Sequence, residues 1–90
     1  MAGSVQKNIF LILIGNRKSA AIEVQKVLTE YGCLIKTRLG VHDNSEKSCS
    51  ESGLIILELV GKDNDIEEFA EKLEIIENVN VKFVTMSLND

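Results

Sequence analysis

The sequence contains no proline and no tryptophan, and only two cysteines and one histidine occur among its 90 residues. Cys33 and Cys49 do not form a Cys-x-x-Cys pair of the kind that zinc and redox sites use, so we expect two free thiols. With one histidine and no acid in a predicted cleft, no Ser-His-Asp, Cys-His or paired-carboxylate arrangement can be assembled. We therefore expect that the protein is not an enzyme and that it uses no cofactor.

Long apolar runs are also missing, and none approaches the ~20 residues that a transmembrane helix needs. Residues 1–7 lack the charged and apolar regions of a secretory signal, so we expect a cytoplasmic protein with no membrane contact. A chain of this length with 44% hydrophobic residues suits one globular domain. We place that domain at residues 8–88, after a flexible N-terminus at residues 1–7.

The net charge of −4 is distributed unevenly along the chain. Residues 1–45 contain six Lys or Arg against three Asp or Glu, a balance of +3, and residues 46–90 contain four against eleven, a balance of −7. Nucleic-acid binding needs a clustered basic surface, which this distribution does not supply over the whole domain. We expect no direct binding of nucleic acid, but a small basic site in the first half is compatible with these counts.

Hydrophobic periodicity predicts four strands and two helices. Strands at residues 8–14 and 54–60 are apolar on both faces, which is typical of strands buried on both sides. A strand at residues 34–42 alternates between a core face and a basic face. The core face consists of Ile35, Thr37, Leu39 and Val41, and the basic face includes Lys36, Arg38 and His42. A polar segment at residues 43–52 is expected to be a mobile loop, and the last strand occupies residues 79–88.

Both predicted helices are amphipathic. The first has apolar residues at helical spacing from Ala20 to Tyr31, followed by Gly32 at a position suited to a helix C-terminus. The second, at residues 63–77, carries seven acids and one lysine, and Asp65 with Glu68 resembles a capping box at its start. The resulting order β-α-β-β-α-β predicts a ferredoxin-like α+β sandwich, an antiparallel sheet of order 4-1-3-2 with two helices on one face.

Strands that are apolar on both faces imply a partner for the uncovered face of this sheet. One face of each of these strands must point away from the helices. On the first strand this face consists of Phe10, Ile12 and Ile14 or of Ile9, Leu11 and Leu13, and on the strand at residues 54–60 it consists of either the even-numbered or the odd-numbered residues. Soluble monomers rarely expose a contiguous apolar patch of that size. We therefore predict a homodimer, or a tetramer built of dimers, through the open sheet face.

The junction between the first strand and the first helix reads Gly15-Asn16-Arg17-Lys18-Ser19. A glycine permits close backbone approach, and two cations at a helix N-terminus oppose the helix dipole, so a bound carboxylate or phosphate would relieve the mismatch. The alternative is that both cations simply point into solvent. Gly15, Asn16, Arg17 and Lys18 are the candidate ligand-binding residues, with Asn16 or Ser19 as the helix N-cap.

Two other groups of polar residues have weaker functional interpretations. His42 and Cys49 are chemically suited to a transition metal, but two ligands are too few for a closed site. Lys36 and Arg38 are predicted to share a strand face, with Glu58 as a counter-charge across the sheet or across a subunit interface.

Four segments resemble one small family. They are Gly15-Asn16-Arg17, the Val27-Leu28-Thr29-Glu30-Tyr31-Gly32 helix end, Arg38-Leu39-Gly40-Val41, and the region from Leu73 to Val81-Lys82. This pattern is similar to that of the iron-only hydrogenase system regulators, whose fold resembles ACT domains and the C-terminal domain of nickel-responsive regulators. The resemblance covers residues 8–88, although the proline-glycine loop of ordinary ACT domains is not reproduced.

The resemblance implies an oligomeric ACT-like domain that holds a small anionic effector, such as an amino acid, near the Gly15 loop and acts in regulation. Without a DNA-binding domain of its own, such a protein would act on transcription or on a hydrogenase system through a partner. A protein–protein interaction module with no ligand is the second hypothesis, and a metal sensor using His42 and Cys49 is the third.

Overall fold

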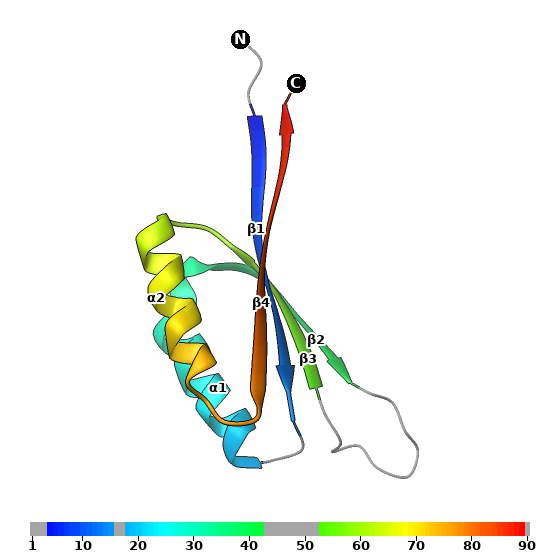
Figure 1. Ribbon diagram of the computed structural model, residues 1–90, viewed down its shortest axis with the longest axis vertical. Helices are drawn as coiled ribbons and strands as arrows, with labels where there is room; N and C mark the ends of the chain where they lie inside the picture. Colours follow the sequence, from blue (N-terminus) through cyan, green and yellow to red (C-terminus); the bar gives the residue numbers. More distant parts are fainter. Residues whose placement is uncertain (1–3, 16–17, 43–52, 90) are drawn as a thin grey trace.

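The computed structural model describes residues 4–15, 18–42 and 53–89 (Figure 1). The elements along the chain are β1 (Ser4–Ile14), α1 (Lys18–Glu30), the 3-10 turn η1 (Gly32–Leu34), β2 (Ile35–His42), β3 (Gly53–Leu59), α2 (Asp63–Glu74) and β4 (Val79–Asn89). The strands form one antiparallel sheet of order β2-β3-β1-β4, with β3 and β1 at its centre. This is the predicted ferredoxin-like topology, which is therefore confirmed.

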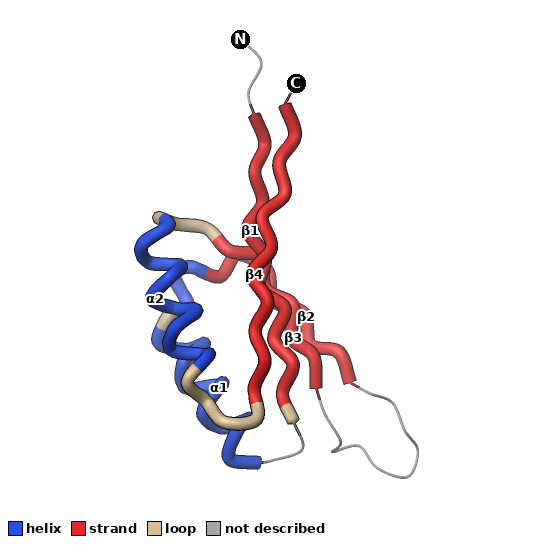
Figure 2. The backbone as a smooth tube through the Cα atoms, in the orientation of Figure 1, coloured by secondary structure: helices blue, strands red, loops and turns tan. Residues whose placement is uncertain are grey.

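Both helices pack on the same side of the sheet, and the hydrophobic core lies between them and the strands (Figure 2). Phe10 at the centre of β1 is fully buried, and its ring lies 5.1 Å from Phe69 of α2 and 5.5 Å from Phe83 of β4. The Tyr31 ring stacks on the Phe69 ring at a centroid distance of 4.9 Å. The core alternates along each central strand, as the period of two requires. Its other fully buried large side chains are Ile12, Val24, Leu28, Leu57, Ile66 and Leu73.

The face of the sheet opposite the helices is apolar and uncovered. The register pairs Leu11 with Ile56 and Leu13 with Leu54, which places the set Ile9, Leu11 and Leu13 on this side and Phe10, Ile12 and Ile14 against the helices. This apolar surface extends to both neighbouring strands, through Leu39 of β2 and through Val84, Met86 and Leu88 of β4. We call these residues, together with Leu54 and Ile56, the open face. The exposed fraction reaches 50% at Leu13 and 66% at Leu88.

The faces of β2 differ from the prediction because the strand is interrupted by a bulge between Ile35 and Thr37. The bulge shifts the alternation by one residue. Ile35 therefore packs against the core, whereas Leu39, predicted to be buried with it, lies on the open face and is 56% exposed. Arg38 lies on the helix side, where its guanidinium donates a hydrogen bond to the Gln25 carboxamide of α1 over 2.8 Å.

Helix α2 also begins differently from the prediction. Its N-cap is Lys62, which makes no side-chain capping bond, and the helix ends at Glu74 rather than at residue 77. The predicted capping box does not form, because Asp65 lies inside the first turn of α2 and is not its N-cap. The Glu68 carboxylate accepts a hydrogen bond from the Tyr31 hydroxyl over 2.8 Å. That bond and burial raise the pKa of Tyr31 to about 12, burial being the larger cause.

Strands β1 and β4 continue beyond the rest of the sheet as a two-stranded ribbon (Figure 1). Strand β1 begins at Ser4, earlier than the predicted residue 8. It pairs with β4 over its whole length, from Ser4 opposite Asn89 to Ile14 opposite Val79, whereas its pairing with β3 begins only at Asn8. Within the part of the chain that the structure describes, residues 4–7 and 86–89 therefore have no third strand, and the apolar side chains of this ribbon continue the open face.

Candidate functional site

Gly15, which the sequence predicted to bind a ligand, contacts Asn78. The Gly15 amide donates a hydrogen bond to the Asn78 carbonyl over 2.8 Å. A Cβ on Gly15 would lie 2.5–2.7 Å from the atoms of the Asn78 carboxamide, so that carboxamide would have to move to admit a side chain. Asn78 itself has a φ of 68°, a left-handed conformation that asparagine tolerates better than most residues. Gly15 is thus needed for the strand-end contact between β1 and β4, and its amide is already bonded.

We predict that Gly15→Ala destabilises the fold by about 1–3 kcal/mol, because the new methyl group displaces the Asn78 carboxamide. Urea unfolding of Gly15→Ala, Asn78→Gly and the double variant measures the coupling between the two positions. Glycine at 78 keeps the left-handed backbone and removes the clashing atoms, so the double variant should lose much less than the sum. Strict additivity would contradict this explanation of Gly15.

Next to this contact the surface contains a hollow of about 330 Å³, lined by Leu13, Gly15, Asn78, Val79 and Asn80. Leu13 and Asn80 are register partners on the open face, so the hollow lies at one end of that face. The Asn78 side chain makes no hydrogen bond within the described part of the chain. Two carboxamides and one exposed leucine therefore surround a space that is polar at one wall and apolar at another.

Lys18 is the first residue of α1, just after this hollow in the chain, and it is exposed. The first turn of α1 contains no acid, so the positive end of its dipole is not offset by a carboxylate of its own. Ser19 lies inside the helix and is therefore not its N-cap. Asn16 and Arg17, the two other predicted binding residues, lie outside the described residues. The structure thus places Gly15 at the hollow and Lys18 at the start of α1.

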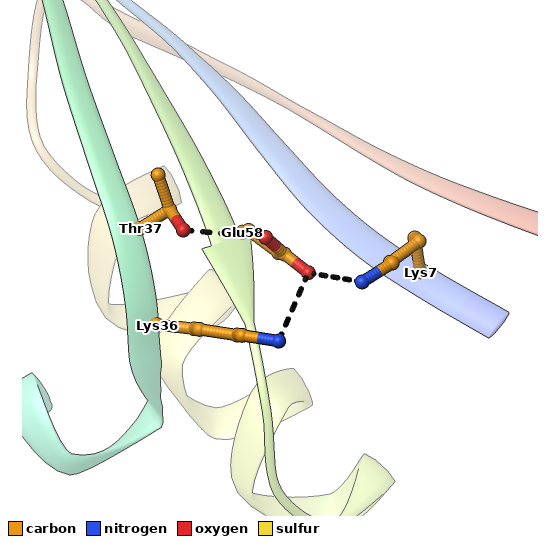
Figure 3. A network of polar contacts seen from close by, with 4 residues as sticks. All are labelled: Lys7, Lys36, Thr37 and Glu58. Carbon is orange, nitrogen blue, oxygen red and sulfur yellow. Dashed lines mark hydrogen bonds and ion pairs between the residues drawn. The ribbon is translucent and has the colours of Figure 1, made fainter. Parts of the chain in front are cut away.

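A polar network crosses one end of the open face (Figure 3). The Glu58 carboxylate of β3 accepts a hydrogen bond from the Lys7 ammonium over 2.8 Å and one from the Thr37 hydroxyl over 3.2 Å. The Lys36 ammonium lies 4.0 Å from the carboxylate oxygen that accepts the hydrogen bond from Lys7. The hydrogen bond from Lys7 is the main cause that lowers the pKa of Glu58 below its usual 4.5. The predicted pairing of Glu58 with Lys36 is present, but Arg38 faces the helices and Lys7 takes its place.

We predict that Glu58→Gln lowers stability at neutral pH and that the difference from the native chain disappears in acid. A carboxyl whose pKa is lower in the folded state stabilises that state above its unfolded pKa, and the contribution is lost as pH falls through the folded pKa. Urea midpoints measured from pH 7 to pH 3 on both proteins test this. The two curves should converge below the usual 4.5; a constant gap would mean that the carboxylate charge is not the cause.

Other surface features give weaker candidate sites. A hollow of about 520 Å³ lies on the outward surface of α1, but its lining residues, Ala21, Ile22, Gln25, Lys26 and Thr29, come from one helix, so no polar groups converge there from a second element. Within residues 4–15, 18–42 and 53–89, no three side chains of His, Cys, Asp and Glu gather as a metal site would require. Cys33 is an exposed free thiol, whereas Cys49 and the predicted loop at residues 43–52 lie outside the described residues. None of the described helices is long and apolar enough to span a membrane.

Asn78 and Asn80 are the residues of this site that sequence reasoning missed. They are more than sixty positions from Gly15 in the chain, and only the pairing of β1 with β4 brings them together. An asparagine between a helix end and a strand is a known signal for a left-handed turn residue, and the Glu77-Asn78-Val79-Asn80 sequence contains it. That signal would have located the turn, but not its contact with Gly15.

The sequence model of one protein family matches residues 7–83, and its description is "TM1266-like: iron-only hydrogenase system regulator, putative". No curated protein sequence gives a significant match. Among solved structures, the uncharacterized protein TM1266 from Thermotoga maritima superposes with a TM-score of 0.78 at 24% identity, over 93% of this chain and 99% of that one. The match therefore covers nearly the full length of both chains.

Two further structures extend the comparison of the fold. The ACT domain of GTP pyrophosphokinase from Chlorobium tepidum gives a TM-score of 0.65 at 14% identity, over 91% of this chain and 100% of that domain. CPII, a nitrogen regulatory PII-like protein from Thiomonas intermedia bound to ADP, AMP and bicarbonate, gives 0.59 at 12% identity, over 98% and 93%. At these identities the similarity establishes an ACT-like fold.

Proposed function

Because the chain belongs to the TM1266-like family of iron-only hydrogenase system regulators, we propose that it is a non-enzymatic regulatory domain that binds a small anionic effector beside Asn78. The observation that supports this most directly is the hollow where β1 ends and β4 begins. Its carboxamides are unbonded in the described part of the chain, and it precedes a helix whose N-terminal turn has no acid. The similarity of the fold to ACT and PII-like proteins is consistent with this role.

The size of the hollow favours a ligand of the size of an amino acid. Its volume of about 330 Å³ is at the lower end of the roughly 300–1,000 Å³ that ligand pockets span. An amino acid or another small carboxylate is therefore the effector class that we propose.

The residues around the hollow suit a ligand with one anionic end. We propose that its carboxylate is bound by the cations that follow Gly15, Arg17 and Lys18, with Asn16 beside them and the N-terminus of α1 contributing its dipole. The carboxamides of Asn78 and Asn80 offer both donors and acceptors to the rest of the ligand, including the ammonium group of an amino acid. Leu13, which is half exposed, provides the apolar wall.

A second copy of the chain would complete this site. Leu13 and Asn80 belong both to the hollow and to the open face, so a subunit packed on the open face would form another wall of the hollow. We propose a homodimer, or a tetramer of such dimers, in which the exposed apolar side chains of the open face are buried between subunits. Effector binding would then be coupled to the association of subunits, which gives a small domain a means of regulation.

A thermal-shift screen of the full-length chain against amino acids, other small carboxylates, bicarbonate, ADP and AMP tests the proposal. An effector present at 100 times its Kd should stabilise the protein by about 2.7 kcal/mol, which corresponds to a shift in Tm of about 10–20 °C for a domain of this size. Arg17→Ala and Asn78→Ala should reduce the shift, and Lys26→Ala, an exposed cation on the outer side of α1, should retain it. No stabilising compound, or a shift unaffected by Arg17→Ala, would argue against the effector site.

The open face also favours a second function, that of an interaction module with no small ligand. Its apolar residues, together with the strongly acidic α2, would then bind another protein or only a second copy. A crystal structure that showed ordered water alone beside Asn78, combined with a negative ligand screen and a specific protein recovered from the native host, would support this function over effector binding.

A further inference from the structure

The two outer strands of the sheet differ in how well their free edges are protected. Strand β2 has eight residues, a bulge near its start, exposed Lys36 and Arg38, and Gly40. Short length, bulges and charged side chains are the features by which proteins prevent edge strands from pairing with other chains. Strand β2 is therefore a protected edge.

Strand β4 has fewer of these protections. It is eleven residues long and its pairing with β1 shows no irregularity. It contains no proline and a single charged residue, Lys82. Within the described residues, no strand pairs with its outer side, since β4 is the last strand of the sheet order. A long, regular and almost uncharged edge of this kind is suited to pairing with a further strand.

The ribbon formed by β1 and β4 gives a second and independent reason for such pairing. Where residues 4–7 pair with residues 86–89, the sheet consists of two strands only, and neither helix lies over them (Figure 1). An isolated two-stranded ribbon is at best marginally stable in water, and a third strand is what stabilises it. A strand added along the whole outer edge of β4 would provide this third strand.

We propose that the outer edge of β4 pairs in antiparallel orientation with β4 of a second copy, so that two four-stranded sheets join into one of eight strands. A two-fold axis perpendicular to the sheet keeps both open faces on the same side, which makes this contact independent of the open-face contact. A second copy is favoured over an unrelated peptide because β4 can pair with itself over all eleven residues. Full overlap requires the middle residue, Val84, to lie opposite the partner's Val84.

This register is also favourable for the side chains. Lys82 lies opposite the partner's Met86, so each lysine can lay its aliphatic stem along an apolar neighbour. At ~3.4 Å per residue the two lysines are about 14 Å apart, beyond the roughly 8 Å over which exposed charges interact at physiological salt. On the helix side, Phe83 lies opposite the partner's Thr85. Asp63 and Glu67 lie beside Phe83 and Thr85, so the acidic pairs of the two subunits would repel one another across this contact. Salt at physiological concentration screens this repulsion.

Residue-resolved amide hydrogen exchange of the native chain at rising protein concentration tests the pairing. Only every second amide of an edge strand points outward, so alternate amides of residues 79–89 should become protected by about tenfold or more, while the free-edge amides of β2 should not. Packing through the open face alone would not produce this alternation. Outer amides of β4 that stay unprotected up to millimolar concentration would overturn the proposal.

Disulfide trapping tests the register. In a chain with Cys33→Ser and Cys49→Ser, Val84→Cys should form a covalent dimer under mild oxidation, because cross-strand Cβ atoms lie about 4.5–5.5 Å apart. Asn80→Cys is the matched control on the same strand and the same face, and at ~3.4 Å per residue its two copies would be about 27 Å apart. Cross-linking at 80 but not at 84 would overturn the proposed register.

Discussion

Replacing Phe10 with alanine is expected to lower the free energy of unfolding by about 3–5 kcal/mol. The Phe10 side chain is fully buried at the centre of β1, and its ring contacts Phe69 of α2 and Phe83 of β4. Truncation removes the apolar contact of one central residue with two elements at once and leaves a cavity that a rigid sheet cannot close. Domains of this size have only about 5–15 kcal/mol of stability, so the variant should be close to unfolding at 37 °C.

Urea unfolding followed by circular dichroism measures this loss, and Phe83→Ala is its matched control. Phe83 is the same residue type and contacts the Phe10 ring itself, but it is 49% exposed, so its truncation should cost about half as much or less. Equal losses at the two positions would show that the core is not centred on Phe10.

The topology was predictable from the sequence because its strongest signal is periodicity. Two strands that are apolar on both faces and are each followed by a helix, together with a strand of alternating pattern, leave few arrangements that obey right-handed crossovers. These two strands are the central β1 and β3 of the sheet. The signal is strong because residues 9–14 contain no polar side chain and residues 54–59 contain only Glu58.

The direction in which those strands face could not be predicted, because both of their faces are apolar. Ile9, Leu11 and Leu13 are as hydrophobic as Phe10, Ile12 and Ile14, so composition does not distinguish the core set from the open set. Only the packing of both helices against one face decides it. The same reason explains the error in β2, where a single bulge exchanges the faces without leaving a mark in the hydrophobic pattern.

The candidate site was predictable only on one of its two strands. Glycine at the end of a strand indicates a close approach to its backbone, and the sequence suggested a ligand as the approaching group. The structure shows that Asn78, in a turn at the start of β4, approaches Gly15, and the ligand beside the two residues remains a prediction. Contacts between residues so far apart in the chain depend on strand register, which is set by the whole sheet rather than by local sequence.

Substitution of Leu11 by lysine is expected to weaken association through the open face by about 100-fold or more, which corresponds to ~2.7 kcal/mol. Leu11 lies at the middle of the open face, opposite Ile56 on β3 and Lys82 on β4. A lysine there places an ammonium group where a second subunit would remove water from it, beside an existing cation and with no acid on the adjacent register positions. The chain itself should still fold, because this side of the sheet is not part of the core.

Sedimentation equilibrium of the native chain, Leu11→Lys and Ile75→Lys distinguishes this effect from a general effect of charge. Ile75 is an apolar residue with 79% exposure at the end of α2, away from the open face, so Ile75→Lys should associate as the native chain does. Leu11→Lys should lose the open-face contact while retaining alternate amide protection along β4, since Leu11 does not reach that edge. A Leu11→Lys variant that is folded and associates with unchanged affinity would show that the open face is not a subunit interface. The additional wall of the effector site, which we assign to a second subunit on that face, would then have to come from another protein.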